Sequence, residues 1–399
     1  MSLLTFSAAR QALLDHARPV AGTELVSTLK ASGRVLAEDL RSSVDVPPLD
    51  NSAMDGYALR CADVAQTGVR LPVSQRIPAG AVGHPLAPGS AARIFTGAPI
   101  PAGADAVVMQ ELCERDGDAV IVNHTPQAGE SIRRRGEDIE AGSVILRAGA
   151  RLRPQSTGLA ASVGIPAVSV RRRLKVAIFF TGDELAMPGE PLPEGGIYNS
   201  NRFVLNALLA ALGCEVTDLG IVRDDFDATR AALRSAAQGH DVIITSGGVS
   251  VGEEDHVKPA VEAEGTLELW NIAIKPGKPL AYGRIGEAAF IGLPGNPVST
   301  FVTFLLLVRP FLLATQGVTE VVPRPVTLRA DFDWPKPIRR REFLRVRIND
   351  AGGLDLYPNQ GSGVLTSTAW ADGLAEIEPE TPVSRGASLR YYPFSDLLD

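Results

Sequence analysis

Residues 245–255 read TSGGVSVGEED, and this stretch decides how the rest of the chain is interpreted. It follows the apolar run 241–244, which is typical of a buried parallel strand. Gly247 and Gly248 let the backbone approach a ligand closely and expose N–H donors, an arrangement that suits a phosphate. Ligands of open α/β sheets bind at the carboxyl ends of the strands. The stretch therefore predicts an anion site, with Asp255 as a candidate metal ligand.

The length and composition indicate a globular protein with several domains. The 399 residues exceed the roughly 250–300 that one hydrophobic core supports. The 45% hydrophobic and 21% charged residues are ordinary proportions. A formal net charge of -7 argues against a nucleic-acid-binding protein, which normally has a basic face.

Cysteine, histidine and hydropathy patterns exclude further classes of protein. Cys61, Cys113 and Cys214 are far apart, so we expect neither a disulfide framework nor a zinc site. The five scattered histidines speak against a histidine-bound transition metal. The first residues lack the pattern of a signal peptide, and the apolar run 301–308 is too short to span a bilayer. We therefore expect a cytoplasmic protein without a membrane segment.

The middle third of the chain alternates strand and helix patterns. The expected strands are 175–180, 215–222, 241–245, 267–274 and 288–293. The expected helices are 201–212, 228–237 with Asp227 as its cap, a short one around Pro259, and a long one from Pro297 towards Gly317. This alternation predicts a doubly wound, mostly parallel sheet with helices on both faces, over residues 175–322.

Both flanks of this region are expected to be rich in short strands. Residues 46–145 and 323–399 hold short β-like runs punctuated by glycine and proline. Helical patterns before residue 45 and at 155–162 bracket the first of these regions. We therefore expect a discontinuous linking domain, 1–45 plus 146–174, an inserted β-rich domain and a C-terminal β domain.

Two loops of the α/β region carry groups that favour anions. The loop 274–279 holds Lys275 and Lys278, two of only six lysines, and two close ammonium groups are tolerable if they share an anionic ligand. The second loop follows a strand and opens a helix, whose N-terminus directs N–H donors and a positive dipole outward. Its candidate ligand contacts are Pro294, Gly295, Asn296, Pro297 and Ser299.

Carboxylates follow three of the expected strands and suggest a magnesium site. Mg²⁺ binds a few carboxylates together with substrate phosphates. The candidates are Glu184, Asp224 and Asp255, whereas Asp183 and Asp225 are equally well explained as helix caps.

Other common signatures are absent. The glycine spacing fits neither a P-loop nor a dinucleotide fingerprint, and there is no nucleophile elbow. Ser246 and Ser250 are therefore interpreted as ligand contacts. The residues alone do not decide whether segment 46–58, which includes Asp55, is a structural turn or part of a site.

Seven motifs in order make the chain resemble the molybdopterin molybdenumtransferase family, the MoeA proteins and the E domain of gephyrin. The resemblance extends nearly from end to end. The motifs are PPLDNSAMDGYA at 47–58, FTGAPIP at 95–101 with GAD at 103–105, RRRGEDI at 133–139, TGDEL at 181–185, SGGVS at 246–250, IKPGKP at 274–279 and LPGNPVS at 293–299.

This resemblance implies an activity, an assembly and partners. The implied reaction inserts molybdate into adenylylated molybdopterin, releases AMP and forms molybdenum cofactor with the help of Mg²⁺. The implied assembly is a homodimer whose cleft pairs the α/β domain of one chain with the inserted domain of the other. Molybdopterin adenylyltransferase and recipient molybdoenzymes are the implied partners.

The resemblance also assigns roles to residues. The 246–250 loop would hold the pterin-linked phosphates, and Lys275, Lys278 and Ser299 would meet molybdate and phosphate. Glu184, Asp224 and Asp255 would hold Mg²⁺ or polarise water. The residues implied on the inserted domain's side of the cleft are Asp55, Thr96, Arg133 and Asp138. Arg345 and Ser362 match the C-terminal contribution to oxyanion binding.

The chain departs from this pattern at three places. Asn271 stands where some relatives carry lysine, and His256 where tyrosine is frequent. The hairpin between Arg345 and Ser362 is shorter.

Two other functions are alternatives to molybdenum insertion. Molybdopterin adenylyltransferases share the α/β domain, but usually have GGTG where this chain has Gly248-Val249-Ser250, and they lack the flanking β domains. A scaffold of the gephyrin type would need a peptide groove, which no sequence feature indicates.

Overall fold

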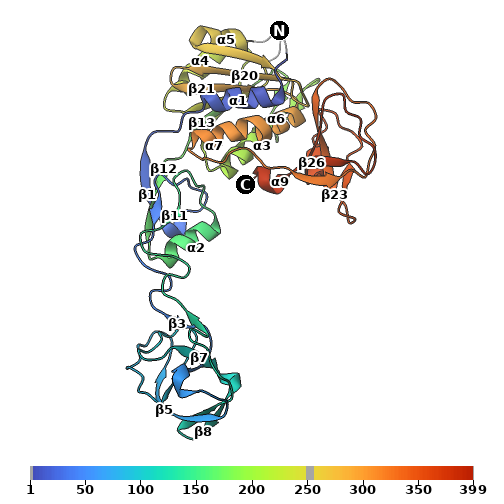
Figure 1. Ribbon diagram of the computed structural model, residues 1–399. Coiled ribbons are helices and arrows are strands. Elements are labelled where there is room, and N and C mark those ends of the chain that lie inside the picture. The colour runs from blue at the N-terminus through green and yellow to red at the C-terminus, as the bar shows by residue number, and fades with distance from the viewer. Residues whose placement is uncertain (1–2, 249–255, 399) are drawn as a thin grey trace.

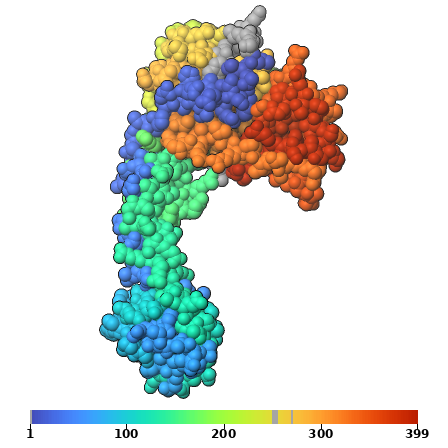
Figure 2. Space-filling view, viewed as in Figure 1, coloured from blue at the N-terminus to red at the C-terminus, as the bar shows by residue number. Residues whose placement is uncertain are grey.

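The computed structural model describes residues 3–248 and 256–398, which form an elongated molecule (Figure 1). A large α/β region lies at one end, with the C-terminal strands beside it. A narrow connecting region leads from there to a compact β-rich region at the far end, and the space-filling view shows the same narrowing (Figure 2).

The α/β region is built on a six-stranded sheet of order β16-β13-β17-β21-β20-β18. The strands are β16 (Glu215–Val222), β13 (Lys175–Thr181), β17 (Val242–Ser246), β21 (Ala288–Leu293), β20 (Pro279–Ile285) and β18 (Thr266–Asn271). The first four are mutually parallel, while β20 and β18 add antiparallel pairings. Every residue of β17 and β21 is buried, which explains their continuous apolar runs. The predicted fold class, a doubly wound and mostly parallel sheet, is confirmed.

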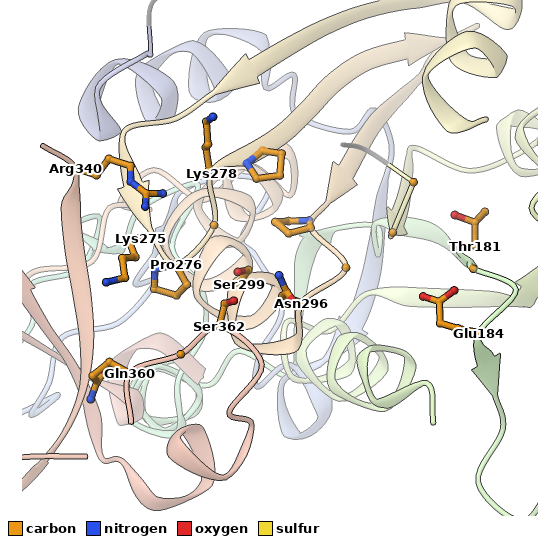
Figure 3. A pocket seen from close by; sticks show the side chains of 18 of the residues that line it. Thr181, Glu184, Lys275, Pro276, Lys278, Asn296, Ser299, Arg340, Gln360 and Ser362 are labelled. Atoms are coloured by element: carbon orange, nitrogen blue, oxygen red, sulfur yellow. The ribbon is translucent and has the colours of Figure 1, made fainter. Parts of the chain in front are cut away.

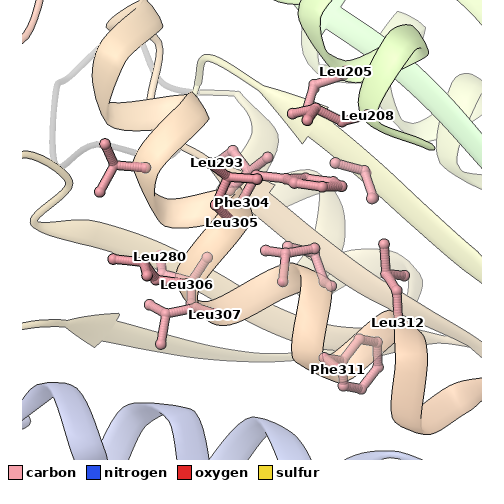
Figure 4. Packing of buried hydrophobic residues seen from close by; sticks show 14 of the residues in the cluster. Leu205, Leu208, Leu280, Leu293, Phe304, Leu305, Leu306, Leu307, Phe311 and Leu312 are labelled. Carbon is pink, nitrogen blue, oxygen red and sulfur yellow. The ribbon is translucent and has the colours of Figure 1, made fainter. Parts of the chain in front are cut away.

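Helices cover both faces of this sheet. One face carries α1 (Phe6–His16), α3 (Ser200–Ala211) and a continuous helical segment made of α6 (Pro297–Thr303), the π-helical turn η4 (Phe304–Val308) and α7 (Arg309–Thr315). The other face carries α4 (Phe226–Ala237) and α5 (Val257–Glu264). Figure 4 shows Leu205 and Leu208 of α3 with Phe304 and Phe311 in the larger core. Each such side chain contributes about 1.5–3 kcal/mol when fully buried.

The long apolar helix belongs to this core. The segment Pro297–Thr315 is the one helix among residues 3–248 and 256–398 with the length and hydropathy to cross a membrane, and 89% of its apolar stretch is buried inside the protein. Burial against the sheet accounts for its apolar composition.

Three details differ from the expectations. The cap of α4 is Asp225, whose side chain accepts from the Ala228 N–H, and not Asp227, because the helix already begins at Phe226. Strand β20 was not expected, since it begins with proline and contains glycine. The expected strand 267–274 divides into β18 and the short β19 (Ile274–Lys275).

The connecting region consists of short antiparallel pairs and one helix. Its elements are β1 (Thr23–Ser27) with β12 (Ala167–Arg171), β2 (Leu40–Arg41) with β11 (Val144–Leu146), the 3-10 turn η1 (Thr28–Lys30) and α2 (Pro154–Ser162). Helix α1 does not belong to this group, because Phe6, Ala9 and Leu13 are buried in the core of the α/β region.

The β-rich region contains a second six-stranded sheet of order β7-β4-β6-β5-β9-β8. Its strands are β4 (Gly56–Leu59), β5 (Val69–Ile77), β6 (Ala91–Ile94), β7 (Ala106–Met109), β8 (Cys113–Asp116) and β9 (Ala119–Val122). The pair β3 (Asn51–Ser52) and β10 (Ile132–Arg133) and the 3-10 turns η2 (Cys61–Asp63) and η3 (Gln110–Leu112) complete it.

The C-terminal region forms a third six-stranded sheet, which includes the short strand β19 from the α/β region. The order is β19-β23-β25-β26-β22, with β24 against β23. Its own elements are β22 (Val326–Arg329), β23 (Arg341–Ile348), β24 (Leu354–Leu356), α8 (Thr366–Trp370), β25 (Gly373–Ile377), β26 (Ser388–Pro393) and α9 (Phe394–Leu398). Because β19 pairs in parallel with β23, Lys275 lies directly opposite Glu342. The pair β14 (Leu185–Ala186) and β15 (Ile197–Tyr198) follows β13.

Candidate active site

A pocket of about 560 Å³ lies where the carboxyl ends of the parallel strands face the C-terminal sheet (Figure 3). It receives the loops after β13, β16, β17 and β21. Strand β20 runs antiparallel to β21, so its amino end, which follows Lys278, lies at the same edge. The residues that line it are Thr181, Gly182, Glu184, Asp224, Gly247, Gly248, Lys275, Pro276, Gly277, Lys278, Pro279, Pro294, Gly295, Asn296, Ser299, Arg340, Gln360, Gly361 and Ser362.

The two glycines after β17 are required by their conformation and by their neighbours. Gly247 has φ +99° and Gly248 has φ +64°, the left-handed region that favours glycine. A Cβ on Gly247 would lie 2.6 Å from the Thr181 carbonyl oxygen, and one on Gly248 would lie 2.5 Å from a Val257 methyl carbon. The loop therefore brings bare backbone to the pocket, as predicted. Ser250 and Asp255 lie outside the described residues.

Ser246 lies beneath this loop and does not line the pocket. Its side chain is buried, and its hydroxyl donates to the Pro294 carbonyl oxygen at 2.8 Å. Asn201 donates to the Ser246 Oγ at 2.8 Å and to the Gly295 carbonyl oxygen at 2.7 Å. In contrast to the predicted ligand contact, the Ser246 side chain ties the two loops together.

Three cationic side chains line one side of the pocket: Lys275, Lys278 and Arg340. Lys275 Nζ lies 3.0 Å from Glu342 Oε1, and Trp334 Nε1 donates to Glu342 Oε2 at 2.9 Å. The Glu342 side chain is only 2% exposed, so it forms a fixed anchor for Lys275. Arg340 Nη1 donates to the Ile274 carbonyl oxygen at 3.2 Å. Lys278 is exposed and forms no ion pair with any described residue.

The loop before α6 lines the pocket with most of its predicted residues. Pro294, Gly295 and Asn296 are lining residues, and so is Ser299 in the first turn of the helix. Pro297 is not, because it turns the chain into α6. The backbone N–H of Val298 donates to the Ser362 carbonyl oxygen at 3.0 Å, which joins this helix to the C-terminal loop.

Arg345 supports that C-terminal loop from below and does not line the pocket. It is 1% exposed, and burial lowers its pKa to about 10. Its guanidinium donates to the Gly361 carbonyl oxygen and to Ser367 Oγ, while its backbone N–H donates to Gln360 Oε1. Instead of the predicted direct contact, Arg345 holds Gln360 and Ser362 at the pocket.

Two predicted carboxylates, Glu184 and Asp224, line the pocket as well. The Glu184 carboxylate lies against the backbone of Gly182, where a Cβ would be 2.7 Å from Oε2. Neighbouring Thr181 has a buried hydroxyl without a hydrogen-bond partner among the described residues. Within residues 3–248 and 256–398, no group of three or more His, Cys, Asp or Glu side chains forms a metal site.

Two carboxylates beside cationic side chains nevertheless fit Mg²⁺. This ion usually takes one or two protein carboxylates, several waters and substrate phosphates, and seldom an all-protein cage. Glu184 and Asp224 provide such a donor set, with Asp255 following on the loop that lies outside the described residues.

The predicted residues of the β-rich region belong to the end of the elongated molecule opposite the α/β region (Figure 1). Asp55 Oδ1 accepts from the Thr96 backbone N–H at 2.8 Å and from its hydroxyl at 2.7 Å. These bonds, helped by Arg93, lower the pKa of Asp55 below its usual value. Arg133 and Asp138 are exposed. None of the four lines the pocket of its own chain.

Arg340, Gln360 and Thr181 are pocket residues that sequence reasoning did not select. Thr181 opens the motif TGDEL and Arg340 lies in a run of three arginines, 339–341, but neither pattern says which side chain faces a cavity. Gln360 precedes the selected Ser362 by two residues.

Comparison with known proteins agrees with this architecture. Residues 4–164 match the family described as MoeA N-terminal region (domain I and II), residues 177–314 the "Probable molybdopterin binding domain", and residues 327–394 the MoeA C-terminal region (domain IV).

Curated relatives match along almost their whole length. Molybdopterin molybdenumtransferase of Haemophilus influenzae is 41% identical over 404 residues, which cover 99% of this chain and 100% of the relative. Molybdopterin molybdenumtransferase 2 of Mycobacterium tuberculosis is 37% identical over 382 residues, with 92% and 94% covered.

A solved structure shares the fold. The molybdopterin biosynthesis MoeA protein from Pyrococcus horikoshii superposes with a TM-score of 0.87 at 32% identity, covering 98% of this chain and 100% of that one. Three matching regions, full-length relatives and a common fold together show that the chain belongs to the molybdopterin molybdenumtransferase family, the MoeA proteins.

Proposed function

We propose that this chain inserts molybdate into adenylylated molybdopterin and releases AMP, forming molybdenum cofactor. The observation that carries the proposal is the charge distribution of the pocket. On one side of the pocket, Lys275, Lys278 and Arg340 supply three positive charges and Glu342 compensates one of them, so two remain in excess on that side. Glu184 and Asp224 also line the pocket, and Mg²⁺ would compensate their two negative charges. Molybdate is a tetrahedral dianion, and a site with two uncompensated positive charges and fixed donors matches it in charge.

The opposite side of the pocket suits the phosphate part of the substrate. Gly247 and Gly248 present backbone N–H groups that can bind phosphate oxygens. The Thr181 hydroxyl, which has no partner among the described residues, can donate a further hydrogen bond to a phosphate oxygen. Glu184 and Asp224 would hold Mg²⁺ there, and the bound ion would neutralise charge on the phosphate oxygens. The chain's own contribution is to place phosphate and molybdate in one cavity, which reduces the entropic cost of bringing them together.

In this proposal the P–O bond between the adenylate and the pterin phosphate breaks. A water oxygen attacks the phosphorus of the adenylate and forms a new P–O bond, AMP leaves, and the pterin keeps its own phosphate. The two dithiolene sulfurs bind molybdenum, and one molybdate oxygen leaves as water with the two thiol protons. Lys278 and Arg340 hold molybdate next to the dithiolene end of the pterin. Asn296, Ser299 and Ser362 complete the polar wall around the reacting groups.

We also propose that two chains complete each cleft. Asp55, Thr96, Arg133 and Asp138 do not reach the pocket of their own chain. A homodimer with isologous contacts would bring them to the pocket of the partner, since each protomer then presents one α/β pocket and one β-rich end. The cytoplasm is the proposed compartment, with a molybdopterin adenylyltransferase as supplier and molybdoenzymes as recipients.

A mixing assay tests the function. Purified protein, adenylylated molybdopterin, Mg²⁺ and molybdate should release AMP only when molybdate is present. If the protein instead consumes ATP with unadenylated molybdopterin, it is an adenylyltransferase. If it turns over neither substrate pair, a binding or scaffold role replaces the enzymatic one.

A further inference from the structure

A second cationic pocket, of about 420 Å³, lies in the β-rich region, remote from the pocket described above. Arg76, Arg93 and Arg115 line it, and Asp118 is the single carboxylate among its lining residues. Two positive charges are therefore in excess, in a chain whose formal net charge is -7. None of the three arginines forms an ion pair with any residue that the structure describes.

The sheet places two of these charges directly side by side. Strands β5 and β6 are parallel neighbours, and their register sets Arg76 opposite Arg93. Like charges in directly opposite positions destabilise a sheet. An anion between them would remove that repulsion, because neither arginine forms an ion pair with Asp118 or with any other described carboxylate.

Aromatic rings hold the guanidinium groups in place. Arg76 lies 4.4 Å from the Phe95 ring centroid, and Arg93 lies 4.6 Å from the same ring and 5.1 Å from that of Tyr57. Such contacts orient a guanidinium but leave its N–H donors available.

Backbone and amide groups fix two of the arginines further. Arg93 donates to the Gly56 carbonyl oxygen at 3.0 Å and to Gln110 Oε1 at 2.5 Å. Arg115 Nε donates to the Gly117 carbonyl oxygen at 3.3 Å. The pocket is thus prepared for a ligand that accepts several hydrogen bonds and carries about two negative charges.

We propose that this pocket is a second anion site that binds a phosphate monoester. A phosphate monoester carries about -1.5 to -2 charges at pH 7 and three acceptor oxygens, which matches two excess positive charges and forked donors. The volume leaves room for more than the phosphate group, so a nucleoside monophosphate such as AMP is the probe of choice. The choice of AMP rests on the proposed function, whereas the preference for a dianion does not.

Calorimetric titration of the full-length protein with AMP tests the site. We expect Arg76→Gln and Arg115→Gln each to weaken one AMP site per chain by about tenfold or more, because a charge-assisted hydrogen bond is lost. Arg70→Gln is the matched control, since Arg70 lies on the same strand, pairs with Asp116 and does not line the pocket.

Competition identifies the ligand's source. If inorganic phosphate displaces AMP from this site, the phosphate group alone is recognised; if only nucleotides displace it, the nucleotide is the ligand. Wild-type stoichiometry and affinity in both arginine variants would overturn the proposal, as would equal binding of adenosine. Since titration needs no turnover, a failure of AMP release in the mixing assay would leave this result unaffected.

Discussion

The α/β end and the β-rich end of the molecule both gather positive charge, but they hold it by different means. In the α/β pocket, Lys275 is anchored by a buried carboxylate, Glu342, across the β19–β23 pairing. In the β-rich pocket, Arg76 and Arg93 are held by the rings of Phe95 and Tyr57 without a described carboxylate partner.

The two ends also differ in what accompanies the cations. The α/β pocket adds Glu184, Asp224 and bare glycine backbone, the groups that Mg²⁺ and phosphate require. The β-rich end presents Asp55, which accepts two hydrogen bonds from Thr96 and does not line the α/β pocket of its own chain. In the proposed dimer, one chain would therefore carry both parts of a catalytic cleft without joining them.

The largest expected effect comes from inactivating each end of the molecule in a separate variant and then combining the two variants. Asp55→Ala and Lys278→Ala should each reduce molybdate-dependent AMP release about a hundredfold, the usual cost of removing a charged contact to a reacting group. Co-expression of the two variants should restore about a quarter of wild-type activity, because half of the dimers are mixed and each has one intact cleft. AMP release by the purified mixture is the measurement.

The control for this experiment is Lys258→Ala, an exposed lysine on α5 that does not line the pocket. It should retain wild-type turnover. If the co-expressed pair is no more active than either single variant, each cleft is formed within one chain and the proposed dimeric arrangement is wrong.

The second prediction removes the anchor of Lys275. Glu342→Gln keeps the size of the side chain but loses its charge, so Lys275 no longer has a fixed position. We expect a loss of about 1–2 kcal/mol in the free energy of unfolding, less than for a fully buried pair because Lys275 remains partly hydrated. Molybdate-dependent AMP release should fall about thirtyfold, mainly through a higher KM for molybdate.

A double-mutant cycle with Lys275→Gln separates positioning from general damage. If Glu342 acts through Lys275, the double variant should be little worse than either single one. Independent, additive losses would show that Glu342 has no role in placing Lys275, and failure of Glu342→Asp to recover activity would argue the same.

How far the sequence could predict the pocket depends on how each residue is positioned. Gly247 and Asp224 follow strands β17 and β16 of one sheet, and Lys278 immediately precedes the antiparallel strand β20 of the same sheet. The order and direction of these strands bring such loops to one edge. Arg340 and Gln360 reach the pocket through the pairing of β19 with β23, between segments 66 residues apart at Ile274 and Arg340. No local pattern contains that information.

Burial of side chains was the second feature of the pocket that the sequence could not predict. Arg345 and Ser246 belong to motifs that suggest ligand contacts, yet both are buried under the loops that line the pocket. Their side chains have polar partners within the protein, and a single sequence does not distinguish such a supporting polar residue from one that touches a ligand. The cap of α4 is Asp225 and not the predicted Asp227 for a similar reason. Aspartate is favoured as an N-cap at either position, so the sequence preference does not decide between them.

The third prediction concerns Arg340, the pocket cation that sequence patterns did not single out. Arg340→Gln should reduce AMP release about tenfold, because one charge-assisted contact to the anion is lost while Lys278 remains. Arg339→Gln is a closely matched control, since that neighbouring side chain is 93% exposed and, among the described residues, forms an ion pair with Glu380 alone, at 3.6 Å. Equal turnover in both variants would exclude Arg340 from anion binding.

The smallest expected effect concerns the joint between the connecting region and the central sheet. Arg172, just after β12, forms a bidentate pair with Asp241, just before β17, with distances of 2.8 and 2.7 Å. Burial raises the pKa of Asp241, but the hydrogen bonds from Arg172 and the Lys175 backbone N–H outweigh it, so the net pKa lies below the usual value.

A lowered folded-state pKa means that this pair stabilises the protein above the unfolded-state pKa of about 3.9 and loses that contribution as the pH falls below it. Asp241→Asn should therefore cost about 1–2 kcal/mol in urea unfolding at pH 7, and the difference from wild type should shrink between about pH 4 and pH 3. Asp227→Asn, whose side chain is 86% exposed, should have no measurable effect. AMP release at pH 7 should not change in either variant, because neither residue lines the α/β pocket or the β-rich pocket. A pH-independent difference for Asp241→Asn would mean that packing at the joint, and not the ionised pair, holds the two regions together.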